Sequence, residues 1–279
     1  MTIGISIDGP QKIHDRNRID IFGHGTYNKV ISAIKQIQNN PTLSSRFKEI
    51  WGLSVFTDDI DLFEVLNHHK KVGLKNAQIK IERKIIDDDF NCEKYKNAYY
   101  ILMRQIIDMA AKGDVSLLRM ILNEEDYLGK YILRIITNQY TSLRCNAGKC
   151  RIVICPNGDI YPCDSFIGIH EMKLGNIYTD RSISPLMESV RVNDCEPCKQ
   201  CSLKYLCGGD CYYNSYINTG NIYTVQPQMC DILKYLCELS IWGCYHLQKE
   251  AHELFENLQK EMLRVIKIRH QIYETLIER

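Results

Sequence analysis

The N-terminal part of the chain changes from one hydrophobic period to another. Over residues 1–9, isoleucine occupies every second position, at Ile3, Ile5 and Ile7. This period of two predicts a strand with one buried face, which Pro10 ends. Over residues 26–38, apolar residues recur every three or four positions, at Val30, Ile34 and Ile37. That spacing predicts a helix with Thr26 as its N-cap.

The same two patterns repeat further along the chain. Apolar residues 51–56 and alternating residues 77–86 predict two more strands. Residues 58–71 between them predict an amphipathic helix with Phe63 and Leu66 facing inward. Strands that alternate with helices form parallel sheets with right-handed crossovers, so an α/β fold is expected. Residues 94–143 contain two or three further helical segments, the clearest of them from Tyr95 to Ala111.

The C-terminal part reads as helix from Asp231 to the end. Leu254, Leu258 and Met262 stand at helical spacing in a charged, amphipathic segment. We expect this helix to pack on the body of the protein, with a partner-binding or dimerising helix as the alternative. Cys237 and Cys244 lie on this helix and are expected to be buried structural thiols, like Cys92.

Composition narrows the functional classes. The chain has 279 residues and a formal net charge of +1, which gives no strong attraction to nucleic acid or to an anionic membrane surface. No apolar run reaches the roughly 18 residues that a membrane helix needs. The start MTIGISIDGP lacks the features of a secretory signal. With reduced cysteines, this predicts a cytoplasmic protein.

Seven of the 13 cysteines form one spaced pattern. Twelve residues separate Cys145 from Gly158, and the run GDIYPC brings Cys163. The segment CKQCSLKYLCGGDC then places four cysteines with two, five and three residues between them, at Cys198, Cys201, Cys207 and Cys211. Cys230 completes the pattern. Thiolates at such spacing, on turns rich in glycine and proline, bind soft metal centres.

This cysteine pattern allows three interpretations. A disulfide framework is disfavoured because the chain is long, has an odd number of cysteines and shows no secretory signal. Zinc is a stronger alternative, since Cys195, Cys198 and Cys201 repeat at CxxC spacing and Cys207 is near enough to complete a four-thiolate site. The pattern nevertheless holds seven thiols, with Cys150 and Cys155 nearby, and seven or eight thiolates suit two iron–sulfur clusters better than one zinc ion.

The same residues resemble a known family. CNAGKCRIVICPNGDIYPCDSF, KLGNIY, CEPCKQCSLKYLCGGDC and QMCDILK resemble the SPASM domain of radical S-adenosylmethionine (SAM) enzymes, over about residues 145–231. GISIDGPQKIHDRNR and GHGTYNKVISAI look like the middle of a radical SAM barrel. The resemblance implies the C-terminal half of a partial (β/α)6 barrel with linking helices at 1–143, a SPASM domain at 144–231 and a helical extension at 232–279.

The resemblance also implies which cysteines bind metal. It assigns a first auxiliary 4Fe–4S cluster to Cys145, Cys163 and Cys211, with Cys150 as the fourth ligand and Cys155 as the fallback. It assigns a second auxiliary 4Fe–4S cluster to Cys198, Cys201, Cys207 and Cys230. The glycines at 208 and 209 would let backbone N–H groups approach the cluster sulfurs.

Four further residues take roles from the resemblance. Asp164, directly after Cys163, matches the proposed general base of anaerobic sulfatase-maturating enzymes, although an aspartate after Pro-Cys also forms turns. Ser6 matches a strand-end residue that contacts SAM, and Asp8 and Arg18 belong to the same segment. The turn Asp8-Gly9-Pro10 is the structural alternative for these positions.

One family motif is missing from the sequence. Radical SAM enzymes bind their reactive cluster through CxxxCxxC, which does not occur here. We expect a fragment of a longer protein, one half of a split enzyme completed by a separate chain, or a degenerate remnant. SAM and a third 4Fe–4S cluster are expected only in the completed enzyme.

The expected activity is radical SAM modification of a peptide or protein, such as thioether or other crosslink formation. Oxidation of a sulfatase serine or cysteine to formylglycine is the alternative. A non-catalytic iron–sulfur module for electron transfer or binding, and a zinc-binding interaction domain, remain as other classes.

Overall fold

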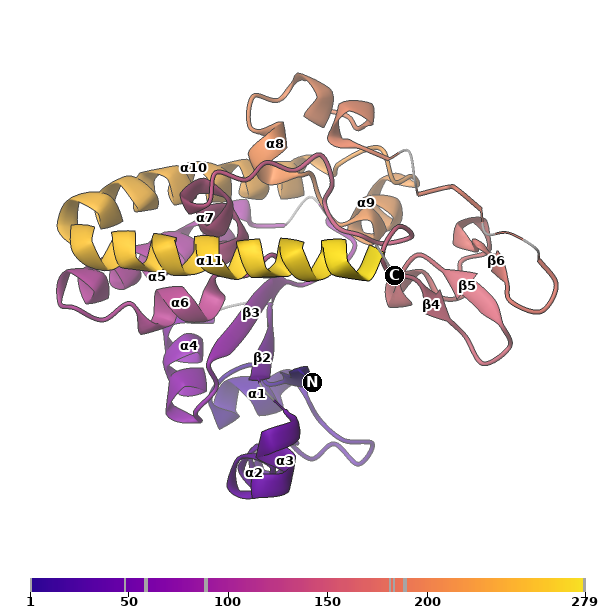
Figure 1. Cartoon of the computed structure of the whole chain (residues 1–279). Helices are drawn as coiled ribbons and strands as arrows, with labels where there is room; N and C mark the ends of the chain where they lie inside the picture. The colour runs from indigo at the N-terminus through magenta and orange to yellow at the C-terminus, as the bar shows by residue number, and fades with distance from the viewer. Residues whose placement is uncertain are drawn as a thin grey trace. The chain divides into compact units, whose positions relative to one another are not determined.

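The computed structural model describes residues 2–47, 49–57, 60–87, 90–180, 182, 184–187 and 190–277. The chain divides into two compact units. The first comprises residues 1–82, 93–139 and 236–279, and the second comprises residues 83–92 and 140–235. Figure 1 labels the helices and strands of both units.

The first unit contains a parallel sheet. Among the described residues it has three strands, β1 (Thr2–Ser6), β2 (Glu49–Phe56) and β3 (Asn76–Ile81), in the order β1-β2-β3. Both strand pairs are parallel, with Gly4 opposite Trp51 and Trp51 opposite Asn76. Along β3 every second residue is buried, which confirms the predicted alternation. β3 ends at Ile81, so the strand predicted over 77–86 is too long.

Helices separate the strands, as the pattern predicts. The connection from β1 to β2 contains α1 (Gln11–Asn17), α2 (Tyr27–Asn39) and α3 (Pro41–Arg46), and the connection from β2 to β3 contains α4 (Leu62–Lys71). Ile34 of α2 is fully buried against Ile7 and Leu74. Thr26 stands at the N-cap of α2, but Tyr27 N–H donates to Asp15 Oδ1 at 2.8 Å instead.

The face that α4 turns toward the sheet differs in detail from the prediction. The buried residues of the helix are Leu62, Val65, Leu66 and His69, whereas Phe63 is half-buried. His69 packs against Gly52 of β2, where a Cβ atom would lie 2.0 Å from His69 Cδ2. Glycine at this position therefore allows the close approach of helix and strand. Residues 58 and 59 of the predicted helix lie outside the described residues.

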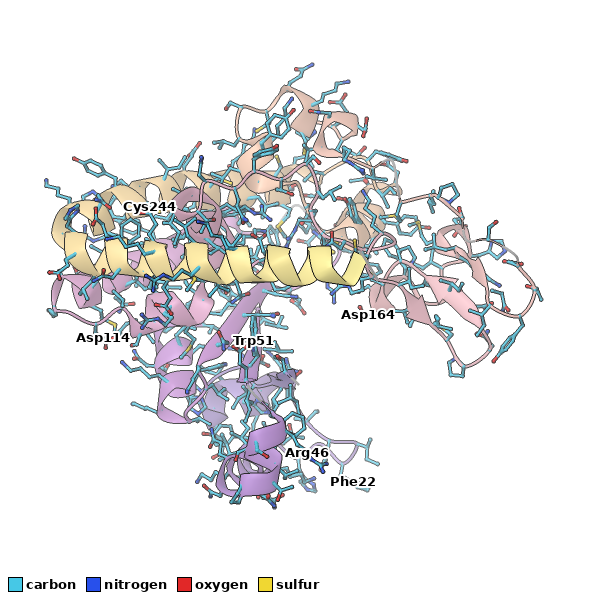
Figure 2. The ribbon with its side chains drawn as sticks, viewed as in Figure 1. Phe22, Arg46, Trp51, Asp114, Asp164 and Cys244 are labelled. Atoms are coloured by element: carbon cyan, nitrogen blue, oxygen red, sulfur yellow. The ribbon has the colours of Figure 1, made fainter. Side chains whose placement is uncertain are left out.

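The remaining helices of the first unit follow β3. They are α5 (Cys92–Ala111), α6 (Ser116–Ile121), α7 (Gly129–Ile136), α10 (Pro227–Glu250) and α11 (His252–Ile277). α6 packs on β3, and α5 buries one apolar face that includes Tyr99 and Leu102. α10 and α11 replace the single predicted helix and meet at Ala251. Cys237 and Cys244 are buried, as predicted, and Figure 2 labels Cys244 on α10, whereas Cys92 is only half-buried.

The second unit is built mainly from short elements. It contains a small antiparallel sheet of β4 (Val153–Ile154), β5 (Asp159–Tyr161) and β6 (Gly175–Asn176), and the short helices α8 (Lys204–Cys207) and α9 (Tyr212–Thr219). Four single 3₁₀ turns are described, at Asp164–Phe166, His170–Met172, Val192–Asp194 and Cys198–Gln200. α10 begins within this unit, at residues 227–235.

Cysteine side chains contribute to the core of the second unit. Cys163, Cys195 and Cys198 are buried in one apolar cluster with Phe166 and Tyr212. Cys145, Cys155 and Cys230 pack against the same cluster. The sequence therefore places most of its spaced thiols around the interior of a unit that has little regular secondary structure.

Residues 84–86 explain the early end of β3. Asn218 of α9 accepts a hydrogen bond from Ile86 N–H at 2.7 Å and donates one to the Lys84 carbonyl at 3.0 Å. These backbone groups bond to a side chain of the second unit instead of to a neighbouring strand. An alternating sequence is therefore not sufficient to continue the sheet here.

Candidate metal centre and the carboxyl edge of the sheet

Four of the predicted metal ligands line one cavity. Its volume is about 20 Å³, room for about one water molecule, and its walls include the thiols Cys198, Cys201, Cys207 and Cys230. The other lining residues are Lys204, Gly209, Val225, Leu233 and Lys234. These four cysteines are the set that the family resemblance assigns to one auxiliary cluster. Cys207 and Cys230 are 23 positions apart in the sequence, so the fold brings two separate segments together here.

Local structure explains how these thiols converge. Cys198 opens a 3₁₀ turn in which Cys201 N–H donates to the Cys198 carbonyl at 2.9 Å. Cys207 ends α8, and Cys230 lies in the first turn of α10. Gly209 has a φ of +86°, and a Cβ atom there would lie 3.8 Å from Cys198 Sγ. Glycine thus brings the backbone close to a thiol at a φ that other residues rarely adopt.

The electrostatics of the cavity favour neutral thiols before metal binds. Burial raises the pKa of Cys198 to about 12, and the neighbouring thiols of Cys207, Cys195 and Cys230 add to the shift. Burial also raises the pKa of Cys230, whereas the Lys234 ammonium lowers it. A thiolate-binding metal or cluster must therefore displace protons when it enters.

The donor chemistry of this cavity fits a soft metal centre. Its metal-ligating side chains, among the residues described, are all thiols, and thiolates select zinc, copper(I) or iron–sulfur clusters. Within the described part of the chain, however, no group of three or more His, Cys, Asp or Glu side chains stands at metal-coordinating positions. The cavity thus shows the ligand set and not a finished coordination geometry.

The other predicted ligands are less closely grouped. Cys145 and Cys211 are near enough for a Cys211 thiolate to help raise the pKa of Cys145, although burial is the main cause. Cys163 is buried, and Cys155 packs against the same apolar cluster, whereas Cys150 is exposed. Lys149 lies beside Cys145 and Cys150, and its Nζ donates to the Val190 carbonyl at 2.9 Å.

Asp164 is exposed at the start of a 3₁₀ turn (Figure 2). The next residue, Ser165, accepts a short hydrogen bond from Arg83 Nη1, and the Arg83 guanidinium lies 5.7 Å from the centre of the Tyr213 ring. Phe166 anchors the turn in the core, 5.5 Å from Tyr213 between ring centres. The carboxylate is therefore accessible to a bound molecule, and the contacts of Ser165 and Phe166 hold the turn that carries it.

The residues predicted near SAM lie at the carboxyl edge of the parallel sheet. Ser6 ends β1 and is exposed, whereas Asp8 is buried. Arg18 forms a bidentate pair with Asp8, with Nε–Oδ2 and Nη2–Oδ1 distances of 2.5 and 3.0 Å. Asp8 Oδ1 also accepts a bond from Val55 N–H at 3.0 Å. Asp8 and Arg18 thus join β1, β2 and the α1 connection, and Ser6 stands at the edge where parallel sheets bind ligands.

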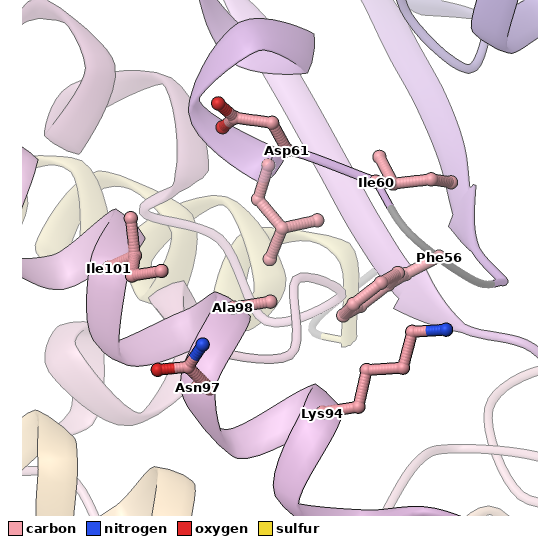
Figure 3. Close-up of a pocket in the computed structure, with 8 residues that line it drawn as sticks. Phe56, Ile60, Asp61, Lys94, Asn97, Ala98 and Ile101 are labelled. Atoms are coloured by element: carbon pink, nitrogen blue, oxygen red, sulfur yellow. The ribbon is translucent and has the colours of Figure 1, made fainter.

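A separate cavity of about 270 Å³ begins at Phe56, the last residue of β2 (Figure 3). Lys94, Asn97, Ala98 and Ile101 of α5 form one wall, and Phe56, Ile60, Asp61 and Leu62 complete the described lining. Sequence reasoning identified none of these as site residues. The signal present was the i, i+3, i+4 and i+7 spacing of the four α5 positions, which reads equally well as helix packing.

No protein-family model matches the chain. A serine-type anaerobic sulfatase-maturating enzyme of Bacteroides thetaiotaomicron is 24% identical over 94% of this chain and 64% of its own length. A cysteine-type enzyme of Clostridium perfringens is 25% identical over 75% of this chain and 57% of its own length. The solved structure of anSMEcpe with bound AdoMet superposes at a TM-score of 0.63, with 20% identity, over 94% of this chain and 68% of that one.

The chain is a distant homologue of the anaerobic sulfatase-maturating enzymes. The relationship confirms the family that the cysteine and SIDGP segments resemble. The solved structure shows that the α/β fold is that of radical SAM/SPASM maturases. The chain spans less than two thirds of the length of both sulfatase-maturating enzymes.

No helix in the described ranges combines the length and apolar character needed to span a membrane.

In a related solved structure, anSMEcpe holds AdoMet and a Kp18Cys peptide, so that protein binds both together.

Proposed function

We propose that this chain is the auxiliary-cluster part of a radical SAM/SPASM maturase that oxidises a serine or cysteine of a sulfatase to formylglycine. The four-thiol cavity carries the proposal, because its lining matches one predicted cluster ligand set in full. The homology to sulfatase-maturating enzymes supports this substrate over crosslink formation in a ribosomal peptide, which is the second candidate.

Two 4Fe–4S clusters are proposed. Cys198, Cys201, Cys207 and Cys230 would hold one of them. Cys145, Cys163 and Cys211 would hold the other, with Cys150 as its fourth ligand and Cys155 as the alternative. When bound, such clusters accept and pass single electrons. The partial (β/α)6 barrel and the contact of Ser6 with SAM belong to the same proposal.

Asp164 is proposed as the general base. Its exposed carboxylate would accept the proton that the substrate hydroxyl or thiol loses as the side chain is oxidised. The sequence contains no CxxxCxxC motif, so the SAM-cleaving cluster would come from polypeptide outside this sequence. A substrate sulfatase or peptide is the expected partner.

Metal analysis tests the cluster proposal. After anaerobic reconstitution with iron and sulfide, we expect about eight iron atoms per chain, and about four in a Cys198→Ser/Cys201→Ser variant. Cys92→Ala is the matched control and should keep the full iron content. One zinc ion per chain without iron would refute the proposal.

The fourth ligand of the first cluster can be decided by the same measurement. Cys150→Ser and Cys155→Ser are compared, and the variant that loses about four iron atoms identifies the ligand.

The base role needs a completed enzyme that supplies the SAM-cleaving cluster. With a sulfatase-derived peptide, Asp164→Asn should abolish formylglycine while 5′-deoxyadenosine still forms. Ser165→Ala on the same turn is the control and should retain product. Unchanged turnover in Asp164→Asn would exclude the carboxylate as base.

A further inference from the structure

Two lysines stand in the wall of the four-thiol cavity. Lys204 and Lys234 line it together with the cysteines, and the apolar part of the lining is Val225 and Leu233. The cavity therefore combines four potential negative charges, two positive charges and a wall that excludes water on part of its surface.

Helical spacing holds each lysine beside a thiol. Lys234 follows Cys230 by four residues on α10, and Lys204 precedes Cys207 by three residues on α8. Residues at these separations are neighbours on a helix surface. Lys204 is held further, because its Nζ donates to the Lys199 carbonyl at 2.9 Å and lies 5.2 Å from the centre of the Tyr205 ring.

Among the described residues, the cavity lining holds two lysines and no carboxylate. Glu196 pairs with Lys199, which does not line the cavity. Asp210 is buried, accepts hydrogen bonds from Cys211 N–H and Asn214 Nδ2, and acts on Cys230 as a negative charge. Apart from its thiols, the described lining of the cavity therefore carries a net positive charge from these two lysines.

We propose that Lys204 and Lys234 raise the reduction potential of a 4Fe–4S cluster held by these four cysteines. The inference rests on the proposed function, since it requires that cluster. A cluster with four thiolate ligands is an anion, and its one-electron reduction adds a further negative charge. Fixed cations in a partly apolar wall stabilise the reduced state more than the oxidised state.

The expected change in reduction potential can be estimated from the effect of a neighbouring charge on an ionisation equilibrium in a protein. An opposite charge within about 4–6 Å shifts such an equilibrium tenfold or more. Lys234 is exposed and Lys204 is half-buried, so water screens part of their effect. We therefore expect that removing both charges changes the ratio of oxidised to reduced cluster at fixed potential by about tenfold, or about 59 mV.

The experiment is a redox titration of the reconstituted full chain with dithionite, followed by electron paramagnetic resonance. Lys204→Gln and Lys234→Gln should each lower the midpoint potential of the same one of the two clusters, and the double variant should lower it by the amount above. Lys204→Arg/Lys234→Arg keeps both charges and should keep the wild-type potential.

Two controls separate this effect from general electrostatics. Lys149 lies beside Cys145 and Cys150, so Lys149→Gln should shift only the other cluster. Lys199 does not line the cavity, so Lys199→Gln should shift the potential of the lysine-lined cluster less than Lys204→Gln or Lys234→Gln does.

The outcomes distinguish this inference from the proposed function. If the wild-type chain takes up no iron, the proposed function fails and the inference fails with it. If both clusters form and titrate at wild-type potentials in the double glutamine variant, only the inference fails. It also fails if the glutamine variants lose iron, because the lysines would then act in assembly.

Discussion

His69 should make the first unit sensitive to acid. Its side chain is fully buried, with Nδ1 2.7 Å from the Val65 carbonyl and Nε2 3.1 Å from Ser54 Oγ. Burial lowers the pKa of His69 from 6.5 to about 4. As the pH falls, the unfolded chain therefore takes up the proton first. The neutral His69 side chain therefore supports the folded state fully above pH 6.5, and this part of the unfolding free energy is lost as the pH falls from 6.5 towards 4.

The magnitude follows from the pKa shift. Lowering the pKa of His69 from 6.5 to about 4 corresponds to about 3 kcal/mol of unfolding free energy. We expect the wild-type chain, free of metal, to lose this amount between pH 7 and pH 4 in addition to the effect of its other titrating groups. The change in His69→Gln should be smaller by about 3 kcal/mol, because glutamine can still donate to Val65 and does not titrate.

Urea unfolding followed by circular dichroism at several pH values measures this difference. His252→Gln is the control, since it replaces a histidine whose side chain is 62% exposed. Parallel stability curves for wild type and His69→Gln would refute the reasoning. If His69→Gln does not fold, the wild-type His69 ring protons can be followed by NMR and should not titrate between pH 7 and pH 5.

Three further predictions concern single side chains. Asp8→Asn should lower the urea-unfolding free energy by about 3 kcal/mol, since it breaks the pair with Arg18, in which the carboxylate is only 4% exposed. Asp114→Asn breaks the exposed pair with Lys70 and should cost under about 1 kcal/mol. Gly52→Ala should cost about 1–3 kcal/mol in the same measurement because of its approach to His69, and equal stability would contradict the close packing. Burial raises the pKa of Cys244 to about 12, so iodoacetamide at pH 8 should leave it unlabelled in the metal-free chain while exposed Cys150 reacts, as peptide mass spectrometry would show.

Much of the first unit follows from hydrophobic period. The elements β1 and α2 were predictable from the sequence alone, because in each the apolar positions are less exposed than the polar positions between them. The end of β3 could not be predicted, because it depends on Asn218, more than 130 residues away. The pairing of Asp8 with Arg18 likewise depends on how the chain turns after β1.

The candidate site was predictable in its ligands and less so in its surroundings. Cysteine spacing indicates a soft metal centre, and the family resemblance assigns to one cluster the four thiols that line the cavity. Lys234 could have been found from its position one helical turn after Cys230. Lys204 could have been found in the same way, from its position one helical turn before Cys207. The α5 cavity gave no signal that differs from ordinary helix packing.

The positions of the tryptophans allow the unfolding of the two units to be followed by two different optical signals. Trp51 lies in β2, where its Nε1 donates to Glu49, and Trp242 lies in α10 beside His246, with 4.4 Å between ring centres. The sequence has two tryptophans, and both belong to the first unit. Fluorescence excited selectively at tryptophan therefore follows that unit alone, whereas the visible absorption of bound iron–sulfur clusters would follow the second. A single denaturation experiment read at both signals can tell whether the two units melt together or one after the other.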